Sequence, residues 1–258
     1  MVKIEKLKEG KEKIIFLMKD TNYSFVNAIR RSVFEIPVLA IDEVEFFKND
    51  SALYDEILAH RLGLVPLKAG KDFTSKSECG CKGKGCLKCT ASCKLKAKGP
   101  CTVYSGDIKT KGFELVHSEM PLVILAKDQE LEFTADAILG RAVEHTKFSP
   151  GMIWFNAYPV INLTKETELY TNLATLCPKK AILIKGNKIE IDPLKCDLCE
   201  ACIEECNKND KKPVDIKYSE KDFIVHIESF GQLDAKDIFT EAINALNANL
   251  KELAKELK

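Results

Sequence analysis

The placement of its cysteines constrains this chain more than any other feature of the sequence. The chain has 258 residues and 11 cysteines, of which five lie within 79–93 and four within 196–206. The number is odd, and residues 1–13 are rich in Lys and Glu without an apolar signal core, so a disulfide framework is not expected. Reduced cysteines that cluster in this way are typical of metal sites. The sequence therefore predicts two metal-binding segments.

The second cysteine group has the spacing of a bacterial ferredoxin. It reads C-x2-C-x2-C-x3-C and consists of Cys196, Cys199, Cys202 and Cys206. In two-cluster ferredoxins the fourth cysteine of each run binds the other cluster, and a proline follows it. The upstream pair Cys177-Pro178 is placed like the end of a first run. We therefore predict one [4Fe–4S] cluster, with the ligands Cys177, Cys196, Cys199 and Cys202.

The first run of this ferredoxin-like pattern has lost its other cysteines. Counting back from Cys177 by the same spacing gives Thr167, Tyr170 and Leu173, none of which is a ligand. A second cluster is therefore not expected, and Cys206 has no assigned role. The alternatives for the whole segment are a zinc ribbon or thiols that bind no metal.

The first cysteine group suits a single zinc ion. Two close thiolate pairs are joined by a short loop of Gly and Lys, which matches a closed tetrahedral Zn²⁺ site. The best four ligands are Cys79, Cys81, Cys86 and Cys89. Cys93 is a spare or an alternative ligand, and Cys101 lies in an extended segment and is expected to be a packed thiol. The alternative is a flexible thiol-rich loop that binds metal only opportunistically.

Charge and motif content exclude several functions for the chain on its own. It has 39 Lys and Arg residues against 39 Asp and Glu, whereas wrapping nucleic acid needs a large basic excess. No apolar run approaches the roughly 20 residues of a membrane helix, so a cytoplasmic location is expected. Glycine-rich nucleotide loops and a G-x-S-x-G motif are missing. We expect no catalytic residues.

Local patterns predict a mixture of helices and strands. Thr21 or Asn22 can cap a helix that ends before Pro37, and Ser51 can cap a second helix that runs to Leu62. A third helix is expected from Thr134 to about His145. The expected strands are Ile14–Met18, Val38–Phe47, Cys101–Ile108, Leu122–Leu125, Ile153–Leu163, Val214–Tyr218 and Phe223–Glu228.

The C-terminal segment predicts a long helix with an apolar seam. From Asp234 onward there is no Pro or Gly, and apolar residues recur in steps of four and three, as in helices that lie alongside one another. Burying six such side chains contributes about 9–18 kcal/mol, so the seam should be covered, by a partner's helix or by the chain's own sheet. The seam consists of Phe239, Ile243, Leu246, Leu250, Leu253 and Leu257.

Several segments together resemble the α-like subunits of DNA-directed RNA polymerase, and in particular the archaeal D-subunit family. The similarity runs from about residue 12 to the C-terminus. The segments that carry it are Asn27–Arg31, Ala59–Leu67, the C-x-C-x4-C-x2-C loop, the ferredoxin-like insertion, Glu144–Pro150 and Ile227–Gly231. The zinc loop has one more residue in its middle spacer than the eukaryotic member has.

The resemblance implies an α+β fold in three parts. A dimerisation domain of a sheet and long packing helices would combine residues 1–46 and 219–258. A mixed insert domain, 47–165, would carry the zinc loop 79–93, and a ferredoxin-like subdomain would cover 166–218.

The resemblance also implies a role in assembly and a set of partners. The C-terminal helix would pair with the small α-like subunit L, and this pair would form the platform for the largest and second-largest subunits, with subunits N and P. Arg30 and Arg31 would be candidate contacts to the second-largest subunit, although two exposed arginines are an equally ordinary interpretation. The alternative function is a ferredoxin-type electron carrier or redox component with a zinc domain, which leaves the apolar seam unexplained.

Overall fold

The computed structural model describes residues 1–70, 73–163, 173–185, 188–207 and 214–257. It is a mixed α+β structure whose backbone contacts divide it into two compact units. Unit 1 comprises Met1–Glu9, Ile14–Asn27 and Ile153–His226. Unit 2 comprises Gly10–Lys13, Ala28–Met152 and Ile227–Lys258. The two-part division follows contacts, whereas the three-part division expected from the sequence remains a proposal.

A four-stranded sheet in the order β1-β2-β14-β11 forms the larger part of unit 1. Its side chains form an aromatic cluster with Tyr23 of the following helix: the ring of Phe155 lies 5.2 Å from that of Tyr23 and 5.7 Å from that of Phe223, edge to face, a favourable arrangement for such rings. The expected strand in 14–18 is confirmed, and the two strands expected within 214–228 are one continuous strand. The strands are β1 (Lys3–Glu9), β2 (Lys13–Lys19), β11 (Gly151–Leu163) and β14 (Val214–Ser229).

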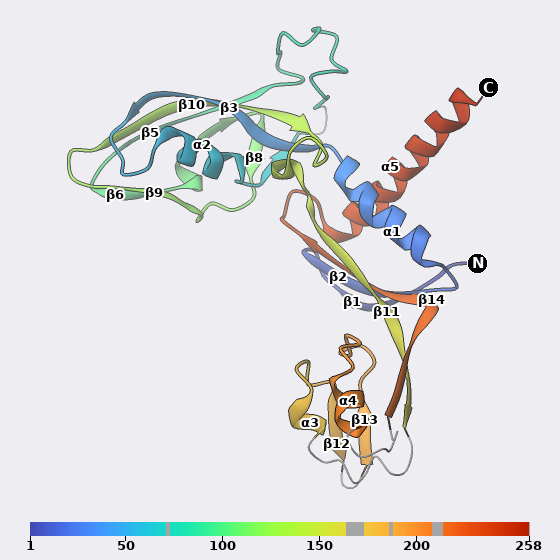
Figure 1. Ribbon diagram of the computed structural model, residues 1–258. Coiled ribbons are helices and arrows are strands. Elements are labelled where there is room, and N and C mark those ends of the chain that lie inside the picture. Colours follow the sequence, from blue (N-terminus) through green and yellow to red (C-terminus); the bar gives the residue numbers. More distant parts are fainter. Residues whose placement is uncertain (71–72, 164–172, 186–187, 208–213, 258) are drawn as a thin grey trace. The chain divides into compact units, whose positions relative to one another are not determined.

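A small subdomain with its own apolar core occupies the cysteine-rich part of unit 1. Figure 1 shows two short helices beside a two-stranded hairpin. The elements are α3 (Leu173–Leu176), β12 (Ile182–Lys185), β13 (Lys188–Ile191) and α4 (Ala201–Asn207). Its buried core consists of Leu173, Ile182, Ile189, Cys206 and Val214.

Unit 2 is built around a second four-stranded sheet in the order β3-β10-β5-β7. Two two-stranded pairs, β4-β8 and β6-β9, and helix α2 (Asp55–Gly63) also belong to unit 2. Leu58 and Leu62 of α2 are fully buried in the same apolar core as Phe133 and Leu131 of the sheet. The strands are β3 (Val38–Asn49), β4 (Leu67–Ala69), β5 (Ala91–Lys98), β6 (Cys101–Tyr104), β7 (Lys109–Lys111), β8 (Phe113–Leu115), β9 (Pro121–Leu125) and β10 (Glu130–Gly140).

The helix expected from Thr134 to about His145 is wrong, because residues 130–140 form strand β10. Every second side chain from Leu131 to Ala137 is buried, which is the period of a strand and not of a helix. β10 hydrogen-bonds to β3 on one side and to β5 on the other. Pairing on both sides overrides the helical preference of the alanines and leucine in this segment.

Of the helix caps expected at Asn22 and Ser51, the first is confirmed and the second is wrong. Helix α1 (Tyr23–Ser32) begins directly after Asn22, whose Oδ1 accepts a hydrogen bond from the backbone N–H of Phe25 at 2.9 Å, so this predicted cap is confirmed. The predicted cap Ser51 is wrong. Its hydroxyl donates to Asn49 Oδ1 at 2.6 Å in a turn, and α2 starts only after Tyr54, which makes no side-chain cap.

The long C-terminal helix is confirmed as α5 (Ala235–Glu256). Its own chain covers one narrow face, and the fully buried residues on it are Ala235, Ile238 and Ala242. It packs on the short 3-10 turn Val33–Glu35, which lies in the same unit. Among the helices in the described ranges, none is both long and apolar enough to cross a membrane.

Gly151 at the start of β11 is a packing constraint that can be tested. A Cβ atom there would lie 2.2 Å from the backbone oxygen of Glu228, so the neighbouring strand would have to move. We expect Gly151→Ala to lower the free energy of unfolding by about 1–3 kcal/mol, measured by thermal or denaturant unfolding. Gly70→Ala is the matched control, because a Cβ at Gly70 meets only an ordinary contact at 3.7 Å. Equal stability of the two variants would contradict the prediction.

Candidate metal centres

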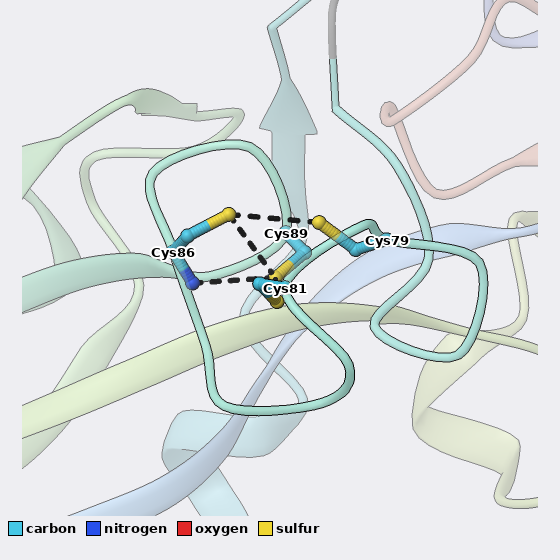
Figure 2. A group of neighbouring side chains, drawn as sticks. All are labelled: Cys79, Cys81, Cys86 and Cys89. Carbon is cyan, nitrogen blue, oxygen red and sulfur yellow. Dashed lines mark hydrogen bonds between the residues drawn. The ribbon is translucent and has the colours of Figure 1, made fainter.

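The structure brings Cys79, Cys81, Cys86 and Cys89 together in the loop between β4 and β5. Their sulfur atoms all lie within 4.8 Å of one another, and Figure 2 shows the four side chains converging from successive turns of the loop. Three sulfur–sulfur distances are 3.5 Å, 3.5 Å and 3.8 Å. Four sulfurs at 2.3 Å from one ion would lie about 3.8 Å apart. The donor set therefore fits a tetrahedral metal ion.

The backbone of the loop explains how so short a segment can surround an ion. Lys82, Gly83 and Gly85 have φ values of 54°, 79° and 82°, which turn the chain back on itself between the two cysteine pairs. The backbone N–H of Cys89 donates to the oxygen of Cys86 at 2.9 Å, and the N–H of Cys86 faces the sulfur of Cys89 at 3.4 Å. These bonds fold the second pair into a tight turn.

The electrostatics of the loop favour a thiolate at one position. The backbone N–H of Cys81, followed by the thiol of Cys86, lowers the pKa of Cys79 to about 6. At Cys86 the backbone N–H of Lys88 has the largest influence and lowers the pKa, but the neighbouring thiols and burial outweigh it and raise it to about 11. A bound cation would displace the remaining thiol protons of its ligands, because cysteine binds metal as the thiolate.

Cys93 is not part of this group. It lies on β5 among the buried side chains of the unit 2 core, where burial, followed by the charge of Asp136, raises its pKa to about 12. A neutral buried thiol of this kind is a packing group. Cys101, on β6, is exposed and was expected to be packed.

The four cysteines predicted to hold an iron–sulfur cluster line one pocket in the small subdomain of unit 1. Cys177, Cys196, Cys199 and Cys202 surround it together with the apolar side chains of Ile182, Ile191 and Ile216. Burial raises the pKa of Cys202 to about 11 and also raises that of Cys196. The thiols come from two chain segments: Cys177 follows α3, and the other three lie before or within α4. The donor chemistry and the apolar lining fit an iron–sulfur cluster.

The loop before α4 has the irregular backbone that a ligand loop needs. Leu198 and Glu200 have φ values of 62° and 61°, so the chain reverses on each side of Cys199. Cys199 is exposed, whereas Cys196 and Cys202 are half-buried. The backbone N–H of Ala181 donates to the sulfur of Cys177 at 3.3 Å.

The positions of a second cluster are occupied by apolar packing where the structure describes them. Leu173 and Cys206 are both fully buried in the core of the small subdomain. Burial raises the pKa of Cys206 above its ordinary value. The other two positions of the lost run, Thr167 and Tyr170, lie outside the described residues.

The apolar seam of α5 changes from buried to exposed along the helix. Phe239, Ile243 and Leu246 are half-buried. The three leucines that follow are 53%, 59% and 82% exposed, and they are Leu250, Leu253 and Leu257. Figure 1 shows this part of α5 running to the C-terminus. On α1, Arg30 is half-buried and Arg31 is exposed.

Sequence comparison places these features in a known class. The RNA polymerase Rpb3/RpoA insert domain matches residues 41–173. Subunit Rpo3 of the DNA-directed RNA polymerase of Methanothermobacter thermautotrophicus is 35% identical over 250 residues, which cover 93% of each chain. The Rpo3 subunits of Pyrococcus horikoshii and Pyrococcus furiosus are 38% and 30% identical and cover 74% and 100% of this chain and 73% and 97% of their own length.

The class is that of the α-like polymerase subunits, which confirms the resemblance found in the sequence. The chain belongs to the Rpo3, or D-subunit, family of archaeal DNA-directed RNA polymerases. It is a non-catalytic assembly subunit of that enzyme, and the electron-carrier alternative is not favoured.

The sulfur geometry of the first loop predicts which cysteines hold a metal ion. We expect Cys89→Ser to abolish the tight binding of one metal ion per chain, because it removes the buried ligand of the four. Cys93→Ser should retain the ion, since Cys93 packs in the sheet core. Elemental analysis of the two purified variants after dialysis against a weak chelator gives the metal content. Retention by Cys89→Ser, or loss from Cys93→Ser, would contradict the assignment.

Proposed function

We propose that this chain organises polymerase assembly as one half of a heterodimer with the small α-like subunit L. The pair forms the platform for the largest and second-largest subunits and for subunits N and P, in the cytoplasm. The observation that carries the proposal is the exposed apolar end of α5, because a leucine stripe on a helix without Pro or Gly is what a second helix packs against. The part of α5 that precedes this stripe packs on its own chain.

In this proposal, each of the three parts expected from the sequence has a separate role. Residues 1–46 and 219–258 act as the dimerisation domain, 47–165 as the insert domain and 166–218 as the ferredoxin-like subdomain. Arg30 and Arg31, in the last turn of α1, are proposed contacts to the second-largest subunit. Neither metal site has a catalytic role in this proposal.

Each metal site serves as a local scaffold in this proposal. Zn²⁺ held by Cys79, Cys81, Cys86 and Cys89 would close the loop, because four thiolates leave no coordination position open for a reaction. A [4Fe–4S] cluster would supply cross-links between the segment that ends at Cys177 and the segment 196–202. A cluster that ties two segments together stabilises both, as metal binding is coupled to folding.

The proposal includes one cluster and not two. The apolar packing of Leu173 and Cys206 supports this choice, since both side chains contribute to the core that holds the small subdomain together. Replacing a cluster ligand by a buried leucine exchanges metal coordination for hydrophobic burial, which contributes about 1.5–3 kcal/mol per side chain.

The heterodimer is tested by a charge in the exposed part of the seam. We expect Leu250→Asp to weaken binding to subunit L by at least about tenfold, because burying a leucine contributes about 1.5–3 kcal/mol and 1.4 kcal/mol is a factor of ten. Affinity is measured by titration of the two purified subunits.

The matched control for this experiment is Lys251→Asp, which places the same side chain one residue further along α5 at an exposed position outside the seam. It should bind nearly as the unmodified chain does. Normal binding by Leu250→Asp would place the partner elsewhere on the chain.

The iron–sulfur proposal is tested by measuring the iron and zinc contents separately. In protein purified without oxygen, we expect Cys199→Ser to lose iron and acid-labile sulfide while it keeps zinc. Cys101→Ser is the control and should keep both, because this exposed thiol donates only to the backbone oxygen of Lys98. Unchanged iron in Cys199→Ser would overturn the ligand assignment, and the absence of iron from the unmodified protein would overturn the cluster itself.

A further inference from the structure

A pocket of about 450 Å³ lies within unit 2, and no cysteine lines it. Its walls come from five places in the chain: Glu12, the residues after α2, the segment 117–120, the segment 146–149, and the turn that joins β14 to α5. The apolar side chains Leu64, Pro66, Met120 and Phe230 line it. Leu64 and Phe230 are both exposed although they are large and apolar. No sequence motif predicted this pocket, although three of its segments belong to stretches that carry the family resemblance.

One polar atom at this pocket has no partner among the residues that the structure describes. Gln232 lines the pocket and is only 8% exposed, and its Oε1 is buried without a hydrogen bond. It is the single atom of this kind among the side chains that the structure describes. Leaving such an acceptor unsatisfied costs about as much as a lost hydrogen bond. A ligand that donates a hydrogen bond would remove this cost.

The turn that carries Gln232 is held rigidly, so the pocket is formed before any ligand arrives. Gly231 has a φ of 101°, and a Cβ there would lie 2.3 Å from Cγ1 of Val116. The hydroxyl of Ser229 accepts from the N–H of Gly231 at 2.8 Å and donates to the backbone oxygen of Leu233. The N–H of Phe230 donates to Pro150 at 3.1 Å. A preformed pocket loses little conformational entropy on binding.

The charges around the pocket favour a basic or neutral donor. Lys147 lines it, but its ammonium group is paired with Asp42 at 2.6 Å. Glu12 places an exposed carboxylate at the pocket, and the His117 side chain also lines it. With the lysine charge neutralised, the fixed charge that remains is negative, which attracts Lys or Arg.

We infer that this pocket is a docking site for a segment of another polymerase subunit. The segment inserts an apolar side chain between Leu64 and Phe230, donates a hydrogen bond to Oε1 of Gln232, and presents a basic residue to Glu12. The inference rests on the assembly role of the chain but not on the pairing through α5, because the pocket residues lie outside that helix. A protein segment fits better than a small ligand because the apolar walls are exposed and open to a partner surface.

The first experiment replaces the unpartnered acceptor. Gln232→Met keeps the length of the side chain and removes the polar group. The isolated full-length variant should have a Tm no lower than that of the unmodified chain, since a buried group without a partner has been removed. In the polymerase, the same variant should be retained about tenfold less well when the complex is challenged with increasing salt or urea. A large fall in Tm of the isolated chain, or unchanged retention, would overturn the inference.

The second experiment identifies the occupant. The photoreactive residue p-benzoylphenylalanine replaces Phe230 in a tagged chain, and the purified polymerase is irradiated and analysed by mass spectrometry. We expect a cross-link to one other polymerase subunit, at a segment with apolar and basic residues, and a reduced yield when Gln232→Met is added. The same photoreactive residue at Ile124, an exposed position on β9 outside the pocket, is the control.

The outcomes distinguish a failure of the pocket inference from a failure of the assembly role. A cross-link to a second copy of this chain, no cross-link at position 230, or the same cross-link from position 124 would overturn the docking site. If the tagged chain does not purify with polymerase subunits at all, the assembly role fails as well. If it purifies with them but no cross-link forms, only the pocket inference fails.

Discussion

The double pairing of β10 is the constraint on which most of unit 2 depends. Its backbone groups bond to β3 on one side and β5 on the other, and every second side chain enters one core. Because the period of a strand is two, a shift of one residue would turn Leu131, Phe133 and Ala135 out of that core. The register of β5 follows from this pairing, with Cys93 opposite Ala135. The position of β5 in turn fixes where the cysteine loop, residues 73–89, ends.

The cysteine loop is anchored at both ends and has little else to hold it. Phe73 packs on the core at one end, Cys89 is buried at the other, and the N–H of Thr74 donates to the oxygen of Lys88 at 2.9 Å. Between these anchors the loop is rich in Gly and Lys and offers few apolar side chains. A segment that cannot bury apolar surface needs another source of stability, and four convergent thiols provide it when they hold an ion. The small subdomain of unit 1 has both features, a small apolar core and, beside it, a pocket lined by four cysteines.

Spacing rules found the cysteine groups because thiol chemistry depends on a few residues at short separation. The sequence thus predicted that Cys79, Cys81, Cys86 and Cys89 meet. It also predicted α1, α5 and six of the described strands, which are β2, β3, β6, β9, β11 and β14, whereas β1, β4, β5, β7, β8, β12 and β13 were missed. β10 was not predicted either, because Ala135, Ala137 and Leu139 suit a helix locally and only pairing with distant strands decides otherwise. The cap at Ser51 failed for a local reason, since its hydroxyl bonds to Asn49 in a turn. The pocket at Gln232 could not be predicted, because it joins segments more than 100 residues apart.

A subunit that performs no chemistry must instead present surfaces that are incomplete without a partner. Two such surfaces are proposed within the part of the chain that the structure describes, and they differ physically. The end of α5 offers apolar area without direction, and its contribution grows with the area covered. The pocket at Gln232 offers one buried acceptor in a rigid turn. Only a segment that places a hydrogen-bond donor at this acceptor binds favourably there. Area provides affinity, whereas a buried polar atom discriminates against any segment that fails to pair with it. Together they would let the chain bind strongly through α5 and select its neighbour through the pocket.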